Sequence, residues 1–337
     1  MAQSILYLGN KLSDPKANPT SHQSLVKGLE SEGFHVYSAS GLKNKYLRLA
    51  DMIFTFLKNS NKFKIVLIDV YSTQNFWYAI IIARLARFFN KKYIPILHGG
   101  DLKNRFENST FATKKLLGNA YHIVSPSRYF KNEVINLGYH KVDHIPNPIL
   151  IKDYAFKERN QFQPKMLWVR AFNEIYNPLM AIKALELILN TYPSAELCMV
   201  GPDKDGSLGQ CVKYAKSKDL PVSFTGKLKK KDWTLLASNF DIFLNTSNID
   251  NSPLSVIESM ALGLPVITTN VGGMPFLIDH IKDGILINKQ APEEISSWVD
   301  WIVQNPDPTK EITTRAREKV LNFDWDKIKE NWKEILV

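Results

Sequence analysis

Two carboxylates in the second half of the chain flank the predicted start of a helix. Asp250 lies in the loop before this helix and Glu258 lies almost two turns inside it. Ser252 is a favourable N-cap, Pro253 suits the first helical position, and Gly263 is a suitable stop. Backbone N–H groups at a helix start attract phosphate, and a carboxylate further along can accept both hydrogen bonds of a ribose diol. The spacing therefore predicts a site for a nucleotide diphosphate, with Asp250 holding the group that it carries.

Two further side chains follow apolar runs that read as strands. Arg170 follows Met166–Val169, and His98 follows Tyr93–Leu97. Open α/β sheets bind ligands at the carboxyl ends of their strands, so both side chains are candidates for a site. Arg170 could stabilise a leaving diphosphate, or form only a surface ion pair. His98 could bind a donor hydroxyl or orient an acceptor, or be structural. The Gly9–Lys11 turn could approach a diphosphate or be a plain loop.

The elements that must position these residues alternate between strand and helix patterns, which is typical of parallel sheets covered by helices on both faces. Predicted strands are Ser4–Leu8, His35–Ser38, Ile65–Val70, Tyr93–Leu97, His122–Ser125, Lys141–Ile145, Lys165–Val169, Glu196–Gly201, Val222–Thr225, Ile242–Asn245, Pro265–Thr268 and Gly284–Ile287. We expect Leu254, Ile257 and Ala261 to form the core face of the helix after Asp250. The fold class is therefore α/β, with two Rossmann-like doubly wound domains.

The length of 337 residues suggests two domains of ordinary size, and 45% hydrophobic residues is typical of a globular protein. Pro146–Pro148 and the polar stretch 152–163 mark the boundary. We predict a first domain at 1–155 and a second at 156–318. The amphipathic segment 319–337, with Asp324 as an N-cap, should pack back on the first domain.

Several features favour a cytoplasmic protein. No apolar stretch is long enough to span a bilayer, and the first residues lack the pattern of a signal peptide. Cys198 and Cys211 are the only cysteines, and free thiols are favoured over a disulfide. Asp324-Trp325-Asp326 matches an acid-x-acid metal pattern by letter, but its position favours helix capping. No cluster has metal-ligand spacing, so no metal is expected.

The positive charge is concentrated in the first half of the chain. Residues 1–150 hold 20 Lys and Arg and 9 Asp and Glu, whereas the remainder carries a net charge of −1. This asymmetry predicts either contact with an anionic surface, such as the inner face of a membrane, or a solvated basic surface with no partner. Nucleic acid is not expected, because no aromatic-basic recognition motif is present. The segment Phe76–Arg87 could be an interfacial membrane helix, but a crossover helix between strands is favoured.

These residues together resemble a known family, the retaining glycosyltransferases of family 4, which have the two-domain GT-B architecture. The strongest match runs from Asp250 to Gly273. Weaker matches occur in the expected order along the chain: Leu97–Asp101, Val124–Ser127, Ile145–Pro148, Val200–Pro202 and Phe323–Trp325. The resemblance covers nearly the whole chain.

The resemblance implies roles for individual residues. Asp250, where the family usually has a glutamate, would touch the donor sugar, and Glu258 would bind the ribose. The backbone near Leu254 would contact the diphosphate, and Gly201 would face the nucleotide. Arg170 fits the family's arginine on the donor phosphates.

Two positions depart from the family pattern. The lysine expected about five residues after Arg170 falls on Tyr176, which carries no charge at neutral pH. Phe276 stands where many relatives have a glutamate.

The sequence thus predicts a retaining glycosyltransferase that moves a sugar from a nucleotide-sugar to a glycan or lipid-linked acceptor, in cell-surface polysaccharide or glycoconjugate synthesis. Retention would proceed by same-face attack, with the leaving phosphate helping to take the acceptor proton. No cofactor besides the donor substrate is expected. The alternative is a weak or inactive nucleotide-sugar-binding scaffold or partner subunit, which Tyr176 and Phe276 suggest. A sugar-nucleotide epimerase of the same fold is disfavoured, because its acid constellation is not found.

Overall fold

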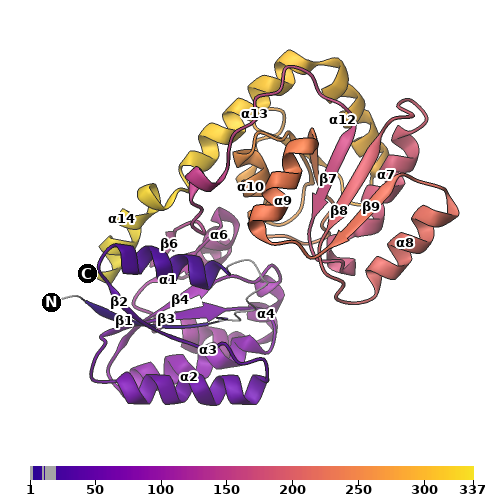
Figure 1. Cartoon of the computed structure of the whole chain (residues 1–337). Helices are drawn as coiled ribbons and strands as arrows, with labels where there is room; N and C mark the ends of the chain where they lie inside the picture. The colour runs from indigo at the N-terminus through magenta and orange to yellow at the C-terminus, as the bar shows by residue number, and fades with distance from the viewer. Residues whose placement is uncertain (1–2, 10, 12–19) are drawn as a thin grey trace. The chain divides into compact units, whose positions relative to one another are not determined.

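The computed structural model describes residues 3–9, 11 and 20–337 and divides into two compact units (Figure 1). Unit 1 comprises residues 1–149 and 323–337, and unit 2 comprises residues 150–322. The boundaries therefore lie at 149 and 322, where we had expected 155 and 318. The second boundary is later because helix α13 (Pro306–Leu321) continues past residue 318 within unit 2.

Unit 1 contains a parallel sheet of six strands in the order β2-β1-β3-β4-β5-β6. Its strands are β1 (Ser4–Leu8), β2 (His35–Ala39), β3 (Ile65–Val70), β4 (Lys92–Leu97), β5 (Ile123–Ser125) and β6 (Val142–His144). All six coincide with predicted strands within about two residues. The run of β3 is buried on both faces, as a central parallel strand must be.

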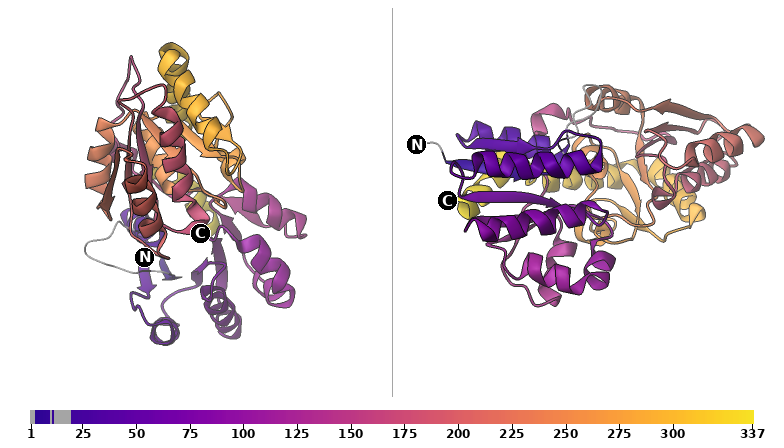
Figure 2. Two further views of the ribbon diagram at one scale, coloured as in Figure 1. Left: turned by 90° about the vertical axis from the view of Figure 1, so that its right-hand side faces the viewer. Right: turned by 90° about the horizontal axis from the view of Figure 1, so that it is seen from below.

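Helices cover both faces of the unit 1 sheet (Figures 1 and 2). One face carries α1 (Ser21–Ser31) and α14 (Trp325–Leu336), whose Trp325 and Trp332 are buried in a core shared with β1 and β3. The other face packs against α2 (Lys45–Asn59), α3 (Asn75–Phe88), α4 (Leu102–Asn108), α5 (Thr110–Leu117) and α6 (Arg128–Asn136). Asp324 caps α14 as predicted, because its side chain accepts a hydrogen bond from the Asp326 N–H at 2.9 Å.

Unit 2 repeats the architecture with a six-stranded parallel sheet in the order β12-β11-β10-β7-β8-β9. Its strands are β7 (Lys165–Val169), β8 (Glu196–Val200), β9 (Val222–Gly226), β10 (Ile242–Asn245), β11 (Val266–Thr269) and β12 (Ile285–Ile287). Its longer helices are α7 (Pro178–Ile188), α8 (Ser207–Ser217), α9 (Lys230–Leu236), α10 (Leu254–Ala261), α12 (Pro292–Gln304) and α13. Two doubly wound α/β units confirm the predicted fold class.

Helix α10 departs from the prediction at its start. The N-cap is Pro253, not Ser252, and no side chain caps the helix. Pro253 has extended backbone angles, and its carbonyl accepts hydrogen bonds from Val256 and Ile257 at 3.1 and 3.3 Å. The predicted stop is confirmed, because Gly263 adopts a positive φ of 78° just after the helix. Every residue of α10 except Leu254 is buried, so the helix lies inside unit 2 and has no solvent face.

Helix α3 is the crossover between β3 and β4 that the sequence favoured. Its inner side, which includes Phe76, Ala79 and Ile82, is buried in the core. Within the described ranges, no helix has the length and apolar character needed to cross a bilayer. The sequence analysis assigned no helix to α4, α5, α6, α13 or the short α11 (Met274–Leu277). Helix α13 begins with a Pro-Asp-Pro sequence, which is compatible with a first helical turn.

Candidate active site

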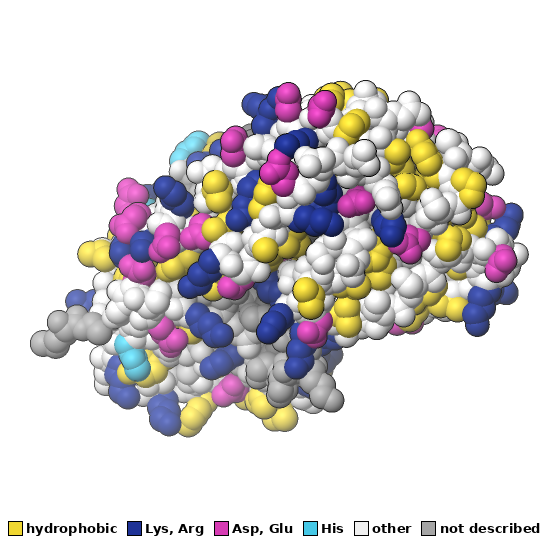
Figure 3. Space-filling model, turned by 45° about the horizontal axis from the view of Figure 1, so that its top comes forward, with side chains coloured by type: hydrophobic (Ala, Val, Ile, Leu, Met, Phe, Trp, Pro, Cys, Tyr) yellow, Lys and Arg dark blue, Asp and Glu magenta, His cyan; other side chains and the backbone are white. Residues whose placement is uncertain are grey.

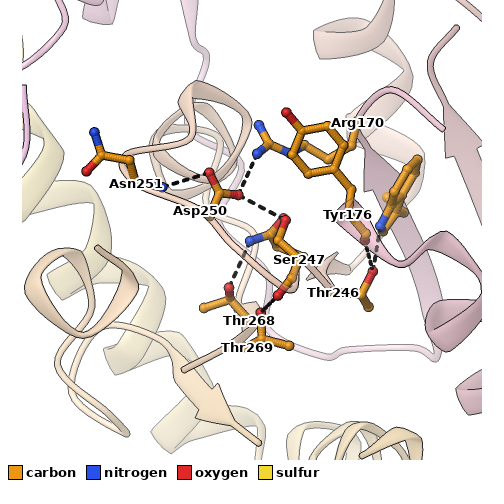
Figure 4. A network of polar contacts seen from close by, with 10 residues as sticks. Arg170, Tyr176, Thr246, Ser247, Asp250, Asn251, Thr268 and Thr269 are labelled. Carbon is orange, nitrogen blue, oxygen red and sulfur yellow. Dashed lines mark hydrogen bonds and ion pairs between the residues drawn. The ribbon is translucent and has the colours of Figure 1, made fainter. Parts of the chain in front are cut away.

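The polar centre of unit 2 is the carboxylate of Asp250, in the loop between β10 and α10 (Figure 4). Arg170 follows β7 directly, and its Nη2 lies 2.5 Å from Oδ2 of Asp250. Ser247 Oγ donates to the same oxygen at 2.9 Å, and the N–H of Asn251 donates to Oδ1 at 3.0 Å. Asp250 is only 7% exposed, so Arg170 is the cation that balances its charge.

Tyr176 lies against the other side of the Arg170 guanidinium, as Figure 4 shows. The Arg170 Cζ is 4.1 Å from the centroid of the Tyr176 ring, close enough for a cation–π contact. Thr246 Oγ1 lies 2.9 Å from the carbonyl oxygen of Tyr176 and accepts a hydrogen bond from Trp168 Nε1 at 3.0 Å. The tyrosine is therefore fixed by the β7 and β10 ends and offers Arg170 a ring face instead of a second charge.

Two glycines allow the backbones of this site to approach closely. A β-carbon at Gly201 would lie 1.7 Å from the carbonyl oxygen of Arg170. One at Gly272 would lie 2.1 Å from the carbonyl oxygen of Asp250, to which the Gly273 N–H donates at 3.0 Å. Any side chain at these positions would push the Arg170 and Asp250 segments away from their neighbours, so the glycines set the geometry of the ion pair.

Two buried hydrogen-bond donors in these segments have no partner among the described residues. They are Arg170 Nε and Ser255 Oγ, the latter in the first turn of α10. The first N–H groups of a helix also have no partner within it. Leaving a buried donor unpaired costs about 1–3 kcal/mol, and an anion bound beside these donors would offset this cost.

Glu258 is 5% exposed and already has two partners in unit 2. Its Oε1 accepts from the hydroxyl of Tyr154 at 2.8 Å and from Lys230 Nζ at 2.7 Å. Burial and the adjacent Glu258 carboxylate raise the pKa of Tyr154, so the phenol stays protonated and donates. Both contacts use the same oxygen of Glu258. The sequence analysis identified Glu258 but neither of its partners, which lie far from it in the chain.

The polar centre of unit 1 is Asp69, near the end of β3. Tyr7 OH donates to its Oδ1 at 2.7 Å, and His98 Nε2 lies 3.0 Å from the same oxygen. Nδ1 of His22 lies 3.4 Å from Oδ2. Burial disfavours the charged carboxylate, but the neighbouring His98 and His22 overcome this and hold the pKa of Asp69 well below its usual range. Burial and Asp69 raise the pKa of Tyr7.

Gly9 lies beside this cluster, at the end of β1. A β-carbon there would be 1.9 Å from Oδ2 of Asp69 and 2.8 Å from Nδ1 of His22. Glycine is therefore required for Asp69 and His22 to meet. Of the predicted Gly9–Lys11 turn, Asn10 lies outside the described residues. His98 also stacks on Tyr71, with ring centroids 5.5 Å apart.

The predicted site residues thus divide between the units. Unit 2 brings Arg170, Tyr176, Gly201 and Asp250 into contact and places Leu254 and Glu258 on the adjoining helix. Unit 1 brings Gly9 and His98 around Asp69, which the sequence analysis missed. A lone carboxylate inside the apolar run Ile65–Val70 was the available signal. No cluster of three or more His, Cys, Asp and Glu side chains suited to a metal ion occurs in the described part of the chain.

The two doubly wound units define a fold class, GT-B. Sucrose-phosphate synthase from Thermosynechococcus elongatus superposes with a TM-score of 0.80 and 17% identity, covering 99% of this chain and 98% of that one. HepE from Anabaena, solved in complex with UDP and glucose, has a TM-score of 0.76 and 16% identity, covering 98% of each chain. Residues 152–319 match the family model described as glycosyl transferases group 1. The chain belongs to this family.

Curated relatives are similar over part of their length. An uncharacterised glycosyltransferase of Haemophilus influenzae is 27% identical over 156 residues, which cover 46% of this chain and 44% of that protein. A UDP-Gal:α-D-GlcNAc-diphosphoundecaprenol α-1,3-galactosyltransferase of Escherichia coli is 25% identical over 199 residues, which cover 54% of this chain and 50% of that protein. The chain therefore spans about half the length of the curated relatives that it matches.

Proposed function

We propose that this chain is a retaining glycosyltransferase of family 4 that transfers a sugar from a nucleotide-sugar to a glycan or lipid-linked acceptor. The observation that carries the proposal is the Arg170–Asp250 pair at the carboxyl end of β7, with Arg170 Nε left without a partner in unit 2. A guanidinium has five N–H donors in a fork that matches phosphate geometry. Asp250 thus holds the Arg170 guanidinium in place, and the guanidinium keeps other N–H donors for a diphosphate.

The chemistry requires charge stabilisation on the leaving group. As the glycosidic bond breaks, negative charge grows on the diphosphate, and fixed positive groups lower the barrier most where they are already oriented. Arg170 and the N–H groups of Leu254 and Ser255 supply these groups, and Asp250 meets the donor sugar. Oε2 of Glu258, the oxygen not used by Tyr154 and Lys230, receives the ribose hydroxyls.

His98 acts on the donor sugar or the acceptor in this proposal, with its ring held by Asp69. Gly9 and Gly201 act indirectly, because Gly9 leaves room for Asp69 and His22 and Gly201 leaves room for the carbonyl group of Arg170. No cofactor besides the donor is needed. The name of the E. coli relative describes an acceptor linked to diphosphoundecaprenol, which supports a lipid-linked acceptor here and a role in cell-surface polysaccharide synthesis. The net charge of +11 in residues 1–150 supports peripheral contact of a cytoplasmic protein with the inner face of an anionic membrane.

A second candidate is a nucleotide-sugar-binding scaffold or partner subunit with little turnover. Tyr176 favours it, because the position expected to hold a second cation instead stacks an uncharged ring on Arg170 at 4.1 Å. Phe276, 42% exposed, stands where a carboxylate was expected.

The purified chain should first be screened by calorimetry against UDP-, GDP- and other sugar nucleotides. The donors that bind should then be assayed for hydrolysis and for transfer to acceptor extracts. Transfer with an unchanged anomeric configuration, read by NMR, supports the retaining enzyme. Binding without turnover on any extract supports the scaffold, and no binding to any sugar nucleotide refutes both.

A further inference from the structure

Helices α2 and α3 of unit 1 expose large apolar side chains on the sides that face away from the core. We call the following set the outer face: Tyr46, Leu47, Phe54 and Leu57 on α2, and Trp77, Ile81 and Phe88 on α3. Their exposed fractions run from 38% for Ile81 to 83% for Phe88. Solitary exposed apolar residues are ordinary, but a contiguous group on adjacent helices indicates an interaction surface.

The spacing places these residues in two stripes. On α3, Trp77, Ile81 and Phe88 follow the helical repeat, together with the exposed Arg84, so they form one line about 16 Å long. A second line on α2 follows the same helical spacing and consists of Leu47, the exposed Ala50, Phe54 and Leu57. Each helix therefore has two apolar sides, one packed on the sheet and one exposed.

The two helices that carry these stripes are held next to each other. Near the start of both helices, Tyr78 OH donates to the carbonyl oxygen of Lys45 at 2.9 Å. Near their ends, the rings of Phe56 and Phe89 have centroids 5.6 Å apart. Figures 1 and 2 show α2 and α3 side by side on the same side of the sheet. The outer face is thus a fixed surface that two helices share.

Basic side chains surround this apolar surface. Lys45, Lys58, Arg84 and Arg87 are exposed, and Asp51 is the only acidic residue in the two helices. Lys45 Nζ lies 5.1 Å from the Tyr46 ring centroid, and Lys58 Nζ lies 5.8 Å from that of Phe54. Figure 3 shows a different side of the molecule, on which hydrophobic, Lys and Arg side chains lie next to one another along the lower edge with acidic side chains among them.

We propose that the outer face docks on an anionic lipid bilayer, with Phe54, Trp77 and Phe88 entering the headgroup–acyl boundary and the four cations meeting lipid phosphates. Aromatic and aliphatic groups on one side of a helix, bordered by Lys and Arg, fit the interface of such a membrane. A second copy of the chain is a poorer partner, because two copies of the same face would bring like charges together. The inference extends the membrane contact in the proposed function, but it concerns binding and needs no turnover.

The test measures co-sedimentation of the purified full chain with vesicles of phosphatidylcholine containing about 30% phosphatidylglycerol, and with pure phosphatidylcholine vesicles, at low and high salt. We expect binding to the anionic vesicles at low salt that weakens at high salt. The triple variant Phe54→Ser, Trp77→Ser, Phe88→Ser should bind at least tenfold more weakly. A charge variant that carries Lys45→Glu, Lys58→Glu and Arg84→Glu should lose the part of the vesicle binding that high salt weakens.

Matched controls lie in unit 2. One triple variant removes exposed apolar residues and consists of Leu187→Ser, Leu235→Ser and Ile281→Ser. The other triple variant reverses exposed charges and consists of Lys213→Glu, Lys216→Glu and Lys282→Glu. Both should bind vesicles like the unmodified chain. Sugar-nucleotide affinity of the outer-face variants should be unchanged, which separates this proposal from the proposed function. Unimpaired vesicle binding by the triple variant overturns the proposal, as does a dimer of the unmodified chain that the same substitutions dissociate.

Discussion

Each unit holds one buried aspartate near the carboxyl ends of its strands, but the two are surrounded differently. Asp250 in unit 2 pairs with a guanidinium, a hydroxyl and a backbone N–H. Asp69 in unit 1 gathers two imidazoles and a phenol. A guanidinium keeps its charge at every working pH, whereas an imidazole can lose it. Unit 2 is therefore built to present a permanent cation, and unit 1 is built to orient rings.

The largest expected effect comes from removing the permanent cation. Arg170→Ala should lower turnover by about 100-fold or more, because a fixed group that meets charge in the transition state is lost. Steady-state kinetics of donor hydrolysis or transfer would measure this. Arg315→Ala is the control, since Arg315 is exposed and pairs with Glu311 on the surface of α13. Equal activity of the Arg170 variant and the control would remove Arg170 from the site.

Glu258 tests whether unit 2 also binds the nucleoside. Glu258→Gln keeps the size of the side chain but weakens hydrogen bonds with ribose by about 1.5–3 kcal/mol, so nucleotide affinity should fall by roughly 10- to 100-fold. Isothermal calorimetry with the best sugar nucleotide would show it. Tyr154→Phe is the matched control, because it removes a partner of Glu258 and leaves the carboxylate. Unchanged affinity in the glutamine variant would refute the ribose role.

Asp69 tests whether the unit 1 cluster orients His98. Asp69→Asn should lower turnover by about tenfold, on the scale of one lost charge-assisted hydrogen bond, with little change in donor KM. Its pKa is lower in the folded state than in the unfolded state, so the carboxylate stabilises the fold at neutral pH. This contribution is lost as the pH falls below about 4. Urea unfolding should therefore show a gap between the two proteins at pH 7 that narrows toward pH 3. A gap independent of pH would contradict the ionised carboxylate.

The smallest expected effect is an increase in turnover. Tyr176→Lys would replace an aromatic face with a second cation beside Arg170, so turnover should rise by a few-fold if charge on the leaving group limits the rate. Loss of the stack at 4.1 Å opposes this gain by about 0.5–1 kcal/mol. Tyr176→Phe, which keeps the ring, should behave like the unmodified chain in the same assay. A lysine variant no faster than the phenylalanine variant would show that the missing charge is not limiting.

The sequence predicted unit 2 better than unit 1 because of where the information lies. Asp250, Glu258, Gly263 and the Gly272-Gly273 turn are close in sequence, and their spacing alone indicates a loop, a helix and a stop. Asp69 and His98 meet only because β3 and β4 pair in parallel, so that Val70 lies opposite Leu97. The sequence of a single strand does not show which other strand it pairs with.

Local chemistry gave the wrong start for one helix and no start for another. Ser252 is a better capping residue than proline by preference, but the extended backbone of Pro253 takes the position. The sequence analysis assigned no element to residues 306–321, where two prolines begin α13, because the N–H groups of a first turn have no partner within the helix.

Helix α14 has a consequence for how the molecule is made. The chain leaves unit 1 after residue 149 and returns at residue 323, where Trp325 and Trp332 cover one side of the first sheet. Trp325 packs so tightly that a β-carbon at Gly28 would lie 2.7 Å from it. The ribosome must therefore finish unit 2 before unit 1 can close, and the first half of the nascent protein waits with an uncovered apolar surface. A chain that ends before α14 would keep all of unit 2, but its unit 1 would have an uncovered apolar surface and would be prone to aggregate.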